Sequence, residues 1–231
     1  MSRVTYNAGN MTITVAGIKD VERRLGKLKS KAPAAMKFAI NATARKTRKL
    51  MVAKAKARYA VNAKGEKHID DLAQKRKAKN SNLLAELRIA SRDIDIAYFD
   101  HSPMQVFTGT DVLTSAPSEV RARVLKSSPM RPLLDGPHNA AKGFLAQFAS
   151  GHTGMVARQI GSSSPNTRTS KGYYRWTTKD GRVEKLQTVY APSGPAMHNT
   201  IWPDVEPTAA QTLQEQLDRR IEMILEKANK E

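Results

Sequence analysis

The sequence contains no cysteine and few aromatic residues, and these absences exclude several classes of protein. Without cysteine, the 231-residue chain has no disulfide, no cysteine-ligated zinc site and no thiol nucleophile. Aromatic residues make up only 6% of the chain, so its core must be built from aliphatic side chains and methionine. No stretch approaches the roughly 20 apolar residues of a membrane helix, and residues 1–6 contain no signal-peptide segment. The expectation is a soluble cytoplasmic protein with a single domain over residues 1–231.

Acidic residues are also scarce relative to basic ones. The chain has 39 Lys and Arg against 21 Asp and Glu, which gives a formal net charge of +18 and a sequence pI near 10.2. Such an excess favours contact with a polyanion. Charge alone leaves open whether that polyanion is nucleic acid, a membrane surface or an acidic protein face.

The charge is unevenly distributed along the chain. Residues 19–58 carry fourteen Lys or Arg and only two acids, whereas residues 206–231 carry six acids and four basic residues. A basic N-terminal region and a mildly acidic C-terminal region suit head-to-tail packing between subunits. They also suit a simply soluble surface, and both interpretations stay open here.

A long amphipathic helix is predicted over residues 34–59. At about 100° per residue, Met36, Ile40 and Met51 fall on one side with Ala39, Thr43, Thr47 and Leu50, and this apolar stripe is expected to end near Met51. The opposite face is cationic and is a candidate surface for DNA or a partner protein, consisting of Lys37, Arg45, Lys46, Arg48, Lys49 and Lys56. Like charges four residues apart are unfavourable on a helix, so this face suits an anionic neighbour. A salt-screened solvent face is the alternative.

The middle of the chain is typical of strands and the end is typical of a helix. Alternating apolar residues predict strands at 11–15, 83–89, 94–98, 120–125 and 144–148, whereas residues 64–68 are interpreted as a loop. Asp180–Gly181 lies between residues 173–177 and 182–183, a hairpin pattern within an extended arm at 161–183. Residues 206–231 are predicted to form an amphipathic helix. The predicted fold is α+β, with a long basic N-terminal helix and the C-terminal helix packed on a mainly antiparallel sheet, and with a projecting loop or β-arm.

No pattern of catalytic or metal-binding residues emerges. The histidines are not spaced as metal ligands; they are His68, His101, His138, His152 and His198. Asp93 and Asp95 are interpreted as the solvated face of a strand rather than as metal ligands. There is no phosphate-binding glycine loop, no Gly-x-Ser-x-Gly motif and no nucleic-acid module. We therefore expect no enzyme, no cofactor and no metal site.

Residues 143–161, GFLAQFASGHTGMVARQIG, place a histidine between glycines with an apolar stretch on each side. Such a segment could be a catalytic loop, a phosphate-binding loop or a bend between two strands. Glycines allow a positive φ where a chain turns sharply, so the bend is the favoured interpretation, with the His152 imidazole bonded to the turn backbone.

This segment resembles the central signature of the minor tail protein Z family of tailed phages. In that family a strand is followed by a glycine-histidine-glycine turn and a second strand. The matching residues are Gly143, Phe144, Ala146, Gly151, His152, Gly154, Val156 and Arg158.

Other parts of the chain are similar to the same family. The segment LQTVYAPSGPAM, with Tyr190 and Pro192, resembles a second block, although it departs from the family pattern at Gln187 and Ala191. The segments GIKDVERRL, AINATARKTRK and NLLAELRIAS resemble the family's N-terminal helices and a strand. The resemblance covers roughly residues 15–197.

The resemblance implies a structural role in the virion rather than an enzymatic one. Members of the family complete the tail and join it to the head, which implies a neck or tail-terminator-like subunit in a homo-oligomeric, hexameric ring. The implied partners are the tail tube, tail terminator and head–tail connector proteins, with non-specific contact to DNA in the lumen and no membrane. The implied location is the tail or neck of the virion, reached from the host cytoplasm during assembly. A basic cytoplasmic nucleic-acid-binding module is the alternative.

Overall fold

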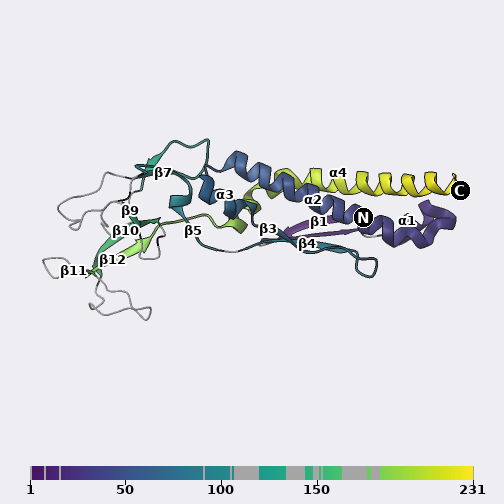
Figure 1. Ribbon diagram of the computed structural model, residues 1–231, viewed down its shortest axis with the longest axis horizontal. Helices are drawn as coiled ribbons and strands as arrows, with labels where there is room; N and C mark the ends of the chain where they lie inside the picture. The colour runs from purple at the N-terminus through teal and green to yellow at the C-terminus, as the bar shows by residue number, and fades with distance from the viewer. Residues whose placement is uncertain are drawn as a thin grey trace. The chain divides into compact units, whose positions relative to one another are not determined.

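The computed structural model (Figure 1) divides the described chain into two compact units. The described residues are 2–7, 9–15, 17–90, 92–104, 106, 120–133, 144–147, 151, 153–162, 176–177 and 183–230. Unit 1 comprises residues 1–57, 67–92 and 192–231, and unit 2 comprises residues 58–66 and 93–191. This division leaves the single-domain organisation a prediction.

Unit 1 is built on a four-stranded antiparallel sheet with the order β1-β2-β4-β3. The strands are β1 (Ser2–Asn7), β2 (Asn10–Val15), β3 (Leu72–Arg76) and β4 (Leu84–Ile89). Apolar residues alternate with polar ones along β2 and β4, and the register aligns Ile13 with both Val4 and Ala85. The buried side chains of neighbouring strands therefore share one face of the sheet. The strands predicted at 11–15 and 83–89 are confirmed.

The helices of unit 1 are α1 (Ile18–Leu25), the 3₁₀ helix η1 (Gly26–Lys31), α2 (Ala32–Arg58) and α4 (Gly194–Ala228). Figure 1 shows α2 and α4 alongside each other on one side of the sheet. The two helices touch where the Arg220 guanidinium of α4 lies 4.1 Å from the Phe38 ring centroid of α2. On the sheet side, the Tyr6 ring of β1 stacks on Trp202 of α4 with centroids 5.7 Å apart. The predicted α+β fold, with long helices at both ends and antiparallel sheets between them, is confirmed.

The amphipathic pattern of α2 is close to the prediction but longer. Met36, Ile40 and Met51 are fully buried, and so is Ala55 one turn further on. The apolar stripe does not end near Met51 as predicted. Lys54 and Arg58 stay exposed at either side of Ala55, so a small residue is enough to continue the contact.

Helix α4 begins at Gly194, well before the predicted start at residue 206. Ser193 caps its first turn, because the Ala196 N–H donates to Ser193 Oγ across 3.4 Å, and Pro195 occupies the first turn. Pro203 and Pro207 lie inside the helix, where proline is normally disfavoured. The helix continues through them because buried residues at helical spacing hold both flanks in the core: Met197, Ile201, Val205, Ala209, Leu213 and Leu217.

Unit 2 contains short antiparallel strands in three sheets, ordered β11-β12-β10-β9, β13-β5 and β6-β7-β8. Their bounds are β5 (Ile94–Asp95), β6 (Asp100–Ser102), β7 (Arg121–Arg123), β8 (Arg131–Pro132), β9 (Phe144–Gln147), β10 (Thr153–Ser162), β11 (Trp176–Thr177), β12 (Val183–Thr188) and β13 (Tyr190–Ala191). The pairing of Thr177 with Val183 agrees with the predicted hairpin, whereas Asp180 and Gly181 lie outside the described residues.

Two predictions in this region are wrong. Residues 64–68 are helical rather than a loop, within α3 (Ala63–Asp70), because Asn62 Oδ1 accepts the Lys64 and Gly65 N–H groups at 3.1 and 3.0 Å. The strand predicted at 94–98 ends at Asp95. There the Asp95 carboxylate accepts the Ala97 N–H at 2.9 Å and starts the 3₁₀ helix η2 (Ile96–Tyr98).

Candidate interaction surface

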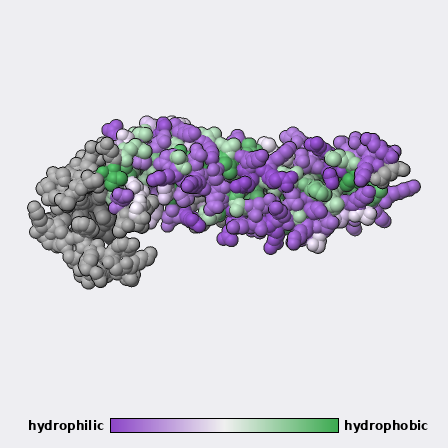
Figure 2. Space-filling view, viewed as in Figure 1, coloured by the Kyte–Doolittle hydropathy of each residue, from purple (hydrophilic) through white to green (hydrophobic). Residues whose placement is uncertain are grey.

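The cationic face of α2 projects from the helix layer of unit 1. Arg45, Lys46, Arg48 and Lys49 are exposed and Lys37 and Lys56 are half-buried, as expected for residues opposite the buried stripe. Helix α2 contains no acidic residue in its whole length. Figure 2 shows hydrophilic side chains covering most of the coloured surface on the face in view. The structure therefore gathers the six predicted residues on a single helix.

Part of this cationic face is used inside unit 1. Arg48 donates through Nε to the Leu72 carbonyl and through Nη2 to the Asp70 carbonyl, the latter across 3.3 Å. Lys56 Nζ donates to Asp70 Oδ2 across 3.1 Å. These contacts fix the turn between α3 and β3 against α2. Arg48 and Lys56 thus have structural roles that the sequence pattern did not reveal.

The remaining basic side chains divide into two groups. Lys37 lies with its Nζ 4.9 Å from the centroid of the Phe38 ring, which is 48% exposed. Arg45, Lys46 and Lys49 have no ion pair within the part of the chain that the structure describes. We call these three residues the basic stripe.

Helix α4 carries acidic residues on its solvent side. The charge count of residues 206–231 predicted an excess of acid there but not its position on the helix. Glu215, Glu222 and Glu226 are exposed and are seven and four residues apart, so they fall within about 40° of one another around the helix. The exposed Arg219 lies on the same side of the helix, so this side carries three acids and one cation. We call the three acids the acidic stripe. Glu215 accepts a hydrogen bond from Gln211 Nε2 at 2.8 Å, and neither Glu222 nor Glu226 has an ion pair among the described residues.

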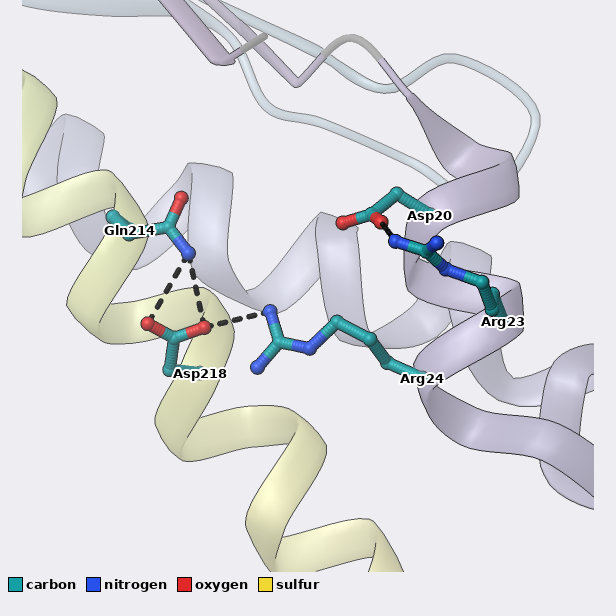
Figure 3. Close-up of polar contacts among 5 residues, drawn as sticks. All are labelled: Asp20, Arg23, Arg24, Gln214 and Asp218. Carbon is teal, nitrogen blue, oxygen red and sulfur yellow. Dashed lines mark hydrogen bonds and ion pairs between the residues drawn. The ribbon is translucent and has the colours of Figure 1, made fainter.

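The neighbouring acid on α4 is bound within unit 1, as Figure 3 shows. Asp218 receives the Arg24 guanidinium of α1 at 2.7 Å and the Gln214 amide at 3.0 and 3.1 Å. Beside it on α1, Arg23 pairs with Asp20. Asp20, Arg23, Arg24 and Asp218 are thus neutralised in pairs, in contrast to Glu222 and Glu226 further along α4.

The residues of the central signature lie in the hairpin of β9 and β10. Phe144 pairs with Val156, and Gly154 pairs with Ala146. Gly151, between the two strands, has a φ of +77°, so the predicted bend requires a glycine at this position. His152 lies outside the described residues, as does Gly143.

The second block pairs with the first. Arg158 of β10 is in register with Leu186 of β12, and the Val189 N–H donates to the Met155 carbonyl at 2.9 Å. Tyr190 of β13 pairs with Asp95 and is 58% exposed, and the exposed Pro192 comes just before the Ser193 cap of α4. The first block and residues 186–191 of the second block are therefore neighbours in unit 2, whereas Pro192 and the residues after it belong to unit 1.

Asp95 is the buried polar centre of unit 2, which contradicts its interpretation as a solvated acid. It is 5% exposed, and its carboxylate accepts the Ala97 N–H and the Met155 N–H, the latter at 3.0 and 3.2 Å. A buried carboxylate that accepts two backbone N–H groups stabilises the local fold. Asp93 is exposed, as predicted. The Asp-Ile-Ala sequence at 95–97 is the local signal, because aspartate often accepts the N–H two residues ahead.

Each described histidine has its own hydrogen-bonding or electrostatic environment. His198 is fully buried in unit 1 with Nε2 3.3 Å from the Ile69 carbonyl, and desolvation by burial lowers its pKa below 6.5 although that carbonyl opposes the shift. In unit 2, His101 Nδ1 lies 2.8 Å from the Phe99 carbonyl. For His68 the pKa is lowered by desolvation first and then by Arg92. The described residues include no group of three or more His, Asp or Glu arranged to hold a metal ion, and His138 lies outside them.

Comparisons with known proteins return no match, whether with family models, curated proteins or solved structures. Among the helices of the described residues, none combines the length and the apolar character needed to cross a membrane.

Proposed function

We propose that this chain is a structural virion protein of a tailed phage or prophage, which completes the tail and joins it to the head as a subunit of a homo-oligomeric ring. The proposal starts from the resemblance of residues 143–161 and 186–197 to the minor tail protein Z family. It places the protein in the tail or neck of the virion, beside the tail tube or tail terminator and the head–tail connector.

One observation carries the proposal. The two blocks that bear the resemblance pair with each other through Arg158 and Leu186 and through the Met155–Val189 hydrogen bond. The described residues of these blocks supply a positive-φ turn at Gly151 and strand contacts. A signature made of turn and pairing residues supports a role in which shape and assembly matter.

The charge distribution adds a second line of support. In unit 1, α2 presents cations without any acid, and α4 presents the acidic stripe. Surfaces of opposite sign on one subunit suit head-to-tail contacts, which close into a ring when the rotation between subunits divides a full turn. We propose a hexamer. The arm at 161–183, most of which lies outside the described residues, is proposed to add strands to a neighbour.

Any contact with DNA in this role is weak and independent of base sequence. Phosphate contacts through Lys and Arg are sequence-blind, and tight binding would impede passage of DNA through the ring. The experiment is size-exclusion chromatography with light scattering and negative-stain imaging of the purified protein, alone and with tail tubes. Ring-shaped oligomers or capped tubes support the proposal. A monomer at every concentration that leaves tail tubes unchanged refutes it.

The second candidate function is a basic nucleic-acid-binding module, which is favoured by the net charge of +18 and by the exposed basic stripe. This function predicts tight DNA binding by the isolated protein that falls steeply as salt rises. A gel-shift series from low to physiological salt separates the candidates. Affinity that persists at physiological salt without any self-association favours the nucleic-acid module.

A further inference from the structure

The side chains of the basic stripe on α2 are exposed, and their like charges repel one another. Arg45 and Lys49 are four residues apart on one face, where like charges destabilise a helix. Lys46 adds a third cation beside them, and the exposed Ala53 and half-buried Val52 follow on the same side. Small side chains next to the cations leave room for another helix to approach closely. An anionic helix is a suitable neighbour for this surface.

The acidic stripe on α4 has the matching pattern. Glu222 and Glu226 are also four residues apart and exposed, and each also lacks an ion pair among the described residues. Both steps span about 6 Å along a helix axis, because an α-helix rises about 1.5 Å per residue. Two antiparallel helices would therefore place Arg45 opposite Glu226 and Lys49 opposite Glu222 at the same time. In this register Glu215 faces the segment of α2 that contains Lys56.

We propose that the basic stripe of α2 docks against the acidic stripe of α4 in a second copy of this chain, with the two helices antiparallel. The occupant follows from charge complementarity and from the shared four-residue spacing. A DNA backbone would satisfy the cations of α2, but it would provide no partner for Glu222 and Glu226 on α4. The contact joins different surfaces on the two copies, so it is of the head-to-tail kind. This inference rests on the proposed function only in that it assumes self-association of the chain.

The experiment is a charge exchange on the full chain, read by sedimentation velocity over a range of protein and salt concentrations. The variants Arg45→Glu/Lys49→Glu and Glu222→Lys/Glu226→Lys are each expected to weaken self-association at least tenfold, because like charges then face each other across the contact. Wild-type association is expected to weaken as salt rises. The matched controls, Lys27→Glu/Lys29→Glu on η1 and Glu206→Lys on α4, change charge at exposed sites outside the stripes and are expected to associate as wild type.

The decisive step is to mix the two variants. The first variant has acids on both stripes and the second has bases on both, so an equimolar mixture is expected to form alternating assemblies where neither variant assembles alone. The quadruple variant, with both stripes exchanged, is expected to regain self-association. Circular dichroism melting curves check that each variant is folded, and all four substituted residues are exposed.

Three outcomes separate this inference from the proposed function, and a fourth refutes both. If wild type assembles and the exchanges change nothing, the α2–α4 contact is refuted and the ring proposal stands. If the basic-stripe variant loses affinity for a DNA duplex in fluorescence anisotropy but assembles as wild type, the stripe is a nucleic-acid surface and the inference is overturned. If the mixture assembles as expected but virions lacking the protein are complete, the contact stands and the tail-completion function falls. A monomeric wild type refutes both.

Discussion

The Tyr6 hydroxyl of β1 donates a hydrogen bond to the Pro195 carbonyl in the first turn of α4, across 3.1 Å and 189 residues of sequence. The same ring stacks on Trp202 further along α4. An edge strand at the start of the chain is thus held by the last helix. Burial raises the pKa of Tyr6 to about 12, although a hydrogen bond with the Gly9 backbone opposes the shift.

Replacing Tyr6 by Phe is expected to lower the free energy of unfolding of unit 1 by about 1 kcal/mol, because it removes one hydrogen bond and keeps the stack. The raised pKa adds a pH dependence. The stabilisation by the neutral Tyr6 hydroxyl is fully present below the pKa of tyrosine in the unfolded chain, near 10, and is lost as the pH rises through about 12. Urea unfolding, followed by Trp202 fluorescence in a Trp176→Phe background, measures both effects. Equal pH profiles for wild type and Tyr6→Phe above pH 10 would contradict the assignment.

Asp95→Ala is expected to destabilise unit 2 by about 2–5 kcal/mol, because it leaves the buried Ala97 and Met155 N–H groups without their carboxylate acceptor. Hydrogen exchange at these two amides is the direct measurement, and both should exchange faster. Asp95→Asn keeps one acceptor oxygen, so it is expected to destabilise unit 2 less than Asp95→Ala. Unchanged exchange at Met155 in the alanine variant would show that β10 does not depend on Asp95.

His198 makes unit 1 sensitive to acid. Its pKa is lowered in the folded protein, so the unfolded chain takes up a proton more readily as the pH falls. The contribution of the neutral His198 side chain to the free energy of unfolding is fully present above pH 6.5 and is lost as the pH falls through the lowered pKa. His198→Gln keeps a neutral N–H donor and removes the titration. Unfolding free energies measured from pH 7.5 to 4.5 should fall less steeply for this variant, and parallel curves would contradict the explanation.

Position 65 requires glycine because the Tyr98 backbone lies close to it within unit 2. A Cβ at this position would lie 2.2 Å from the Tyr98 carbonyl oxygen, which is far inside van der Waals contact. Gly65→Ala is therefore expected to destabilise the protein by about 1–3 kcal/mol despite the higher helix propensity of alanine. Thermal unfolding compared with Ala63→Gly, at an exposed position in the same helix, measures the difference. A Gly65→Ala variant that is more stable than wild type would show that the Tyr98 carbonyl does not restrict this position.

The parts of the fold that could be predicted from the sequence are those set by local periodicity. The alternation at 83–89 and the 3.6-residue pattern of α2 each place one face in the core, and both hold in the structure. Periodicity gave the wrong prediction where a single side chain decides the local structure. Asn62 starts α3 at a segment with little apolar periodicity, and Asp95 turns an alternating strand into a 3₁₀ helix.

Tertiary contacts account for the other differences. Strand β3 lies where the sequence shows a basic cluster and no clear strand pattern. Lys75 and Arg76 belong to an edge strand, and charged residues are common on edge strands. The early start of α4 depends on packing around Trp202 that overrides two prolines. In the sequence Arg48 and Lys56 resemble the other cations of α2, because their partners in residues 70–72 come close only in the folded chain.

The central proposal, that the chain completes the tail and joins it to the head, is tested most directly by deleting its gene from the genome that encodes it and then inducing particle production. Particles are then counted by electron microscopy, with immunogold labelling of the complemented control. The account predicts separate heads and unfinished tails without the protein, and gold at the head–tail junction when it is restored. Complete, infectious particles without the protein, together with no label at the junction, would contradict the account.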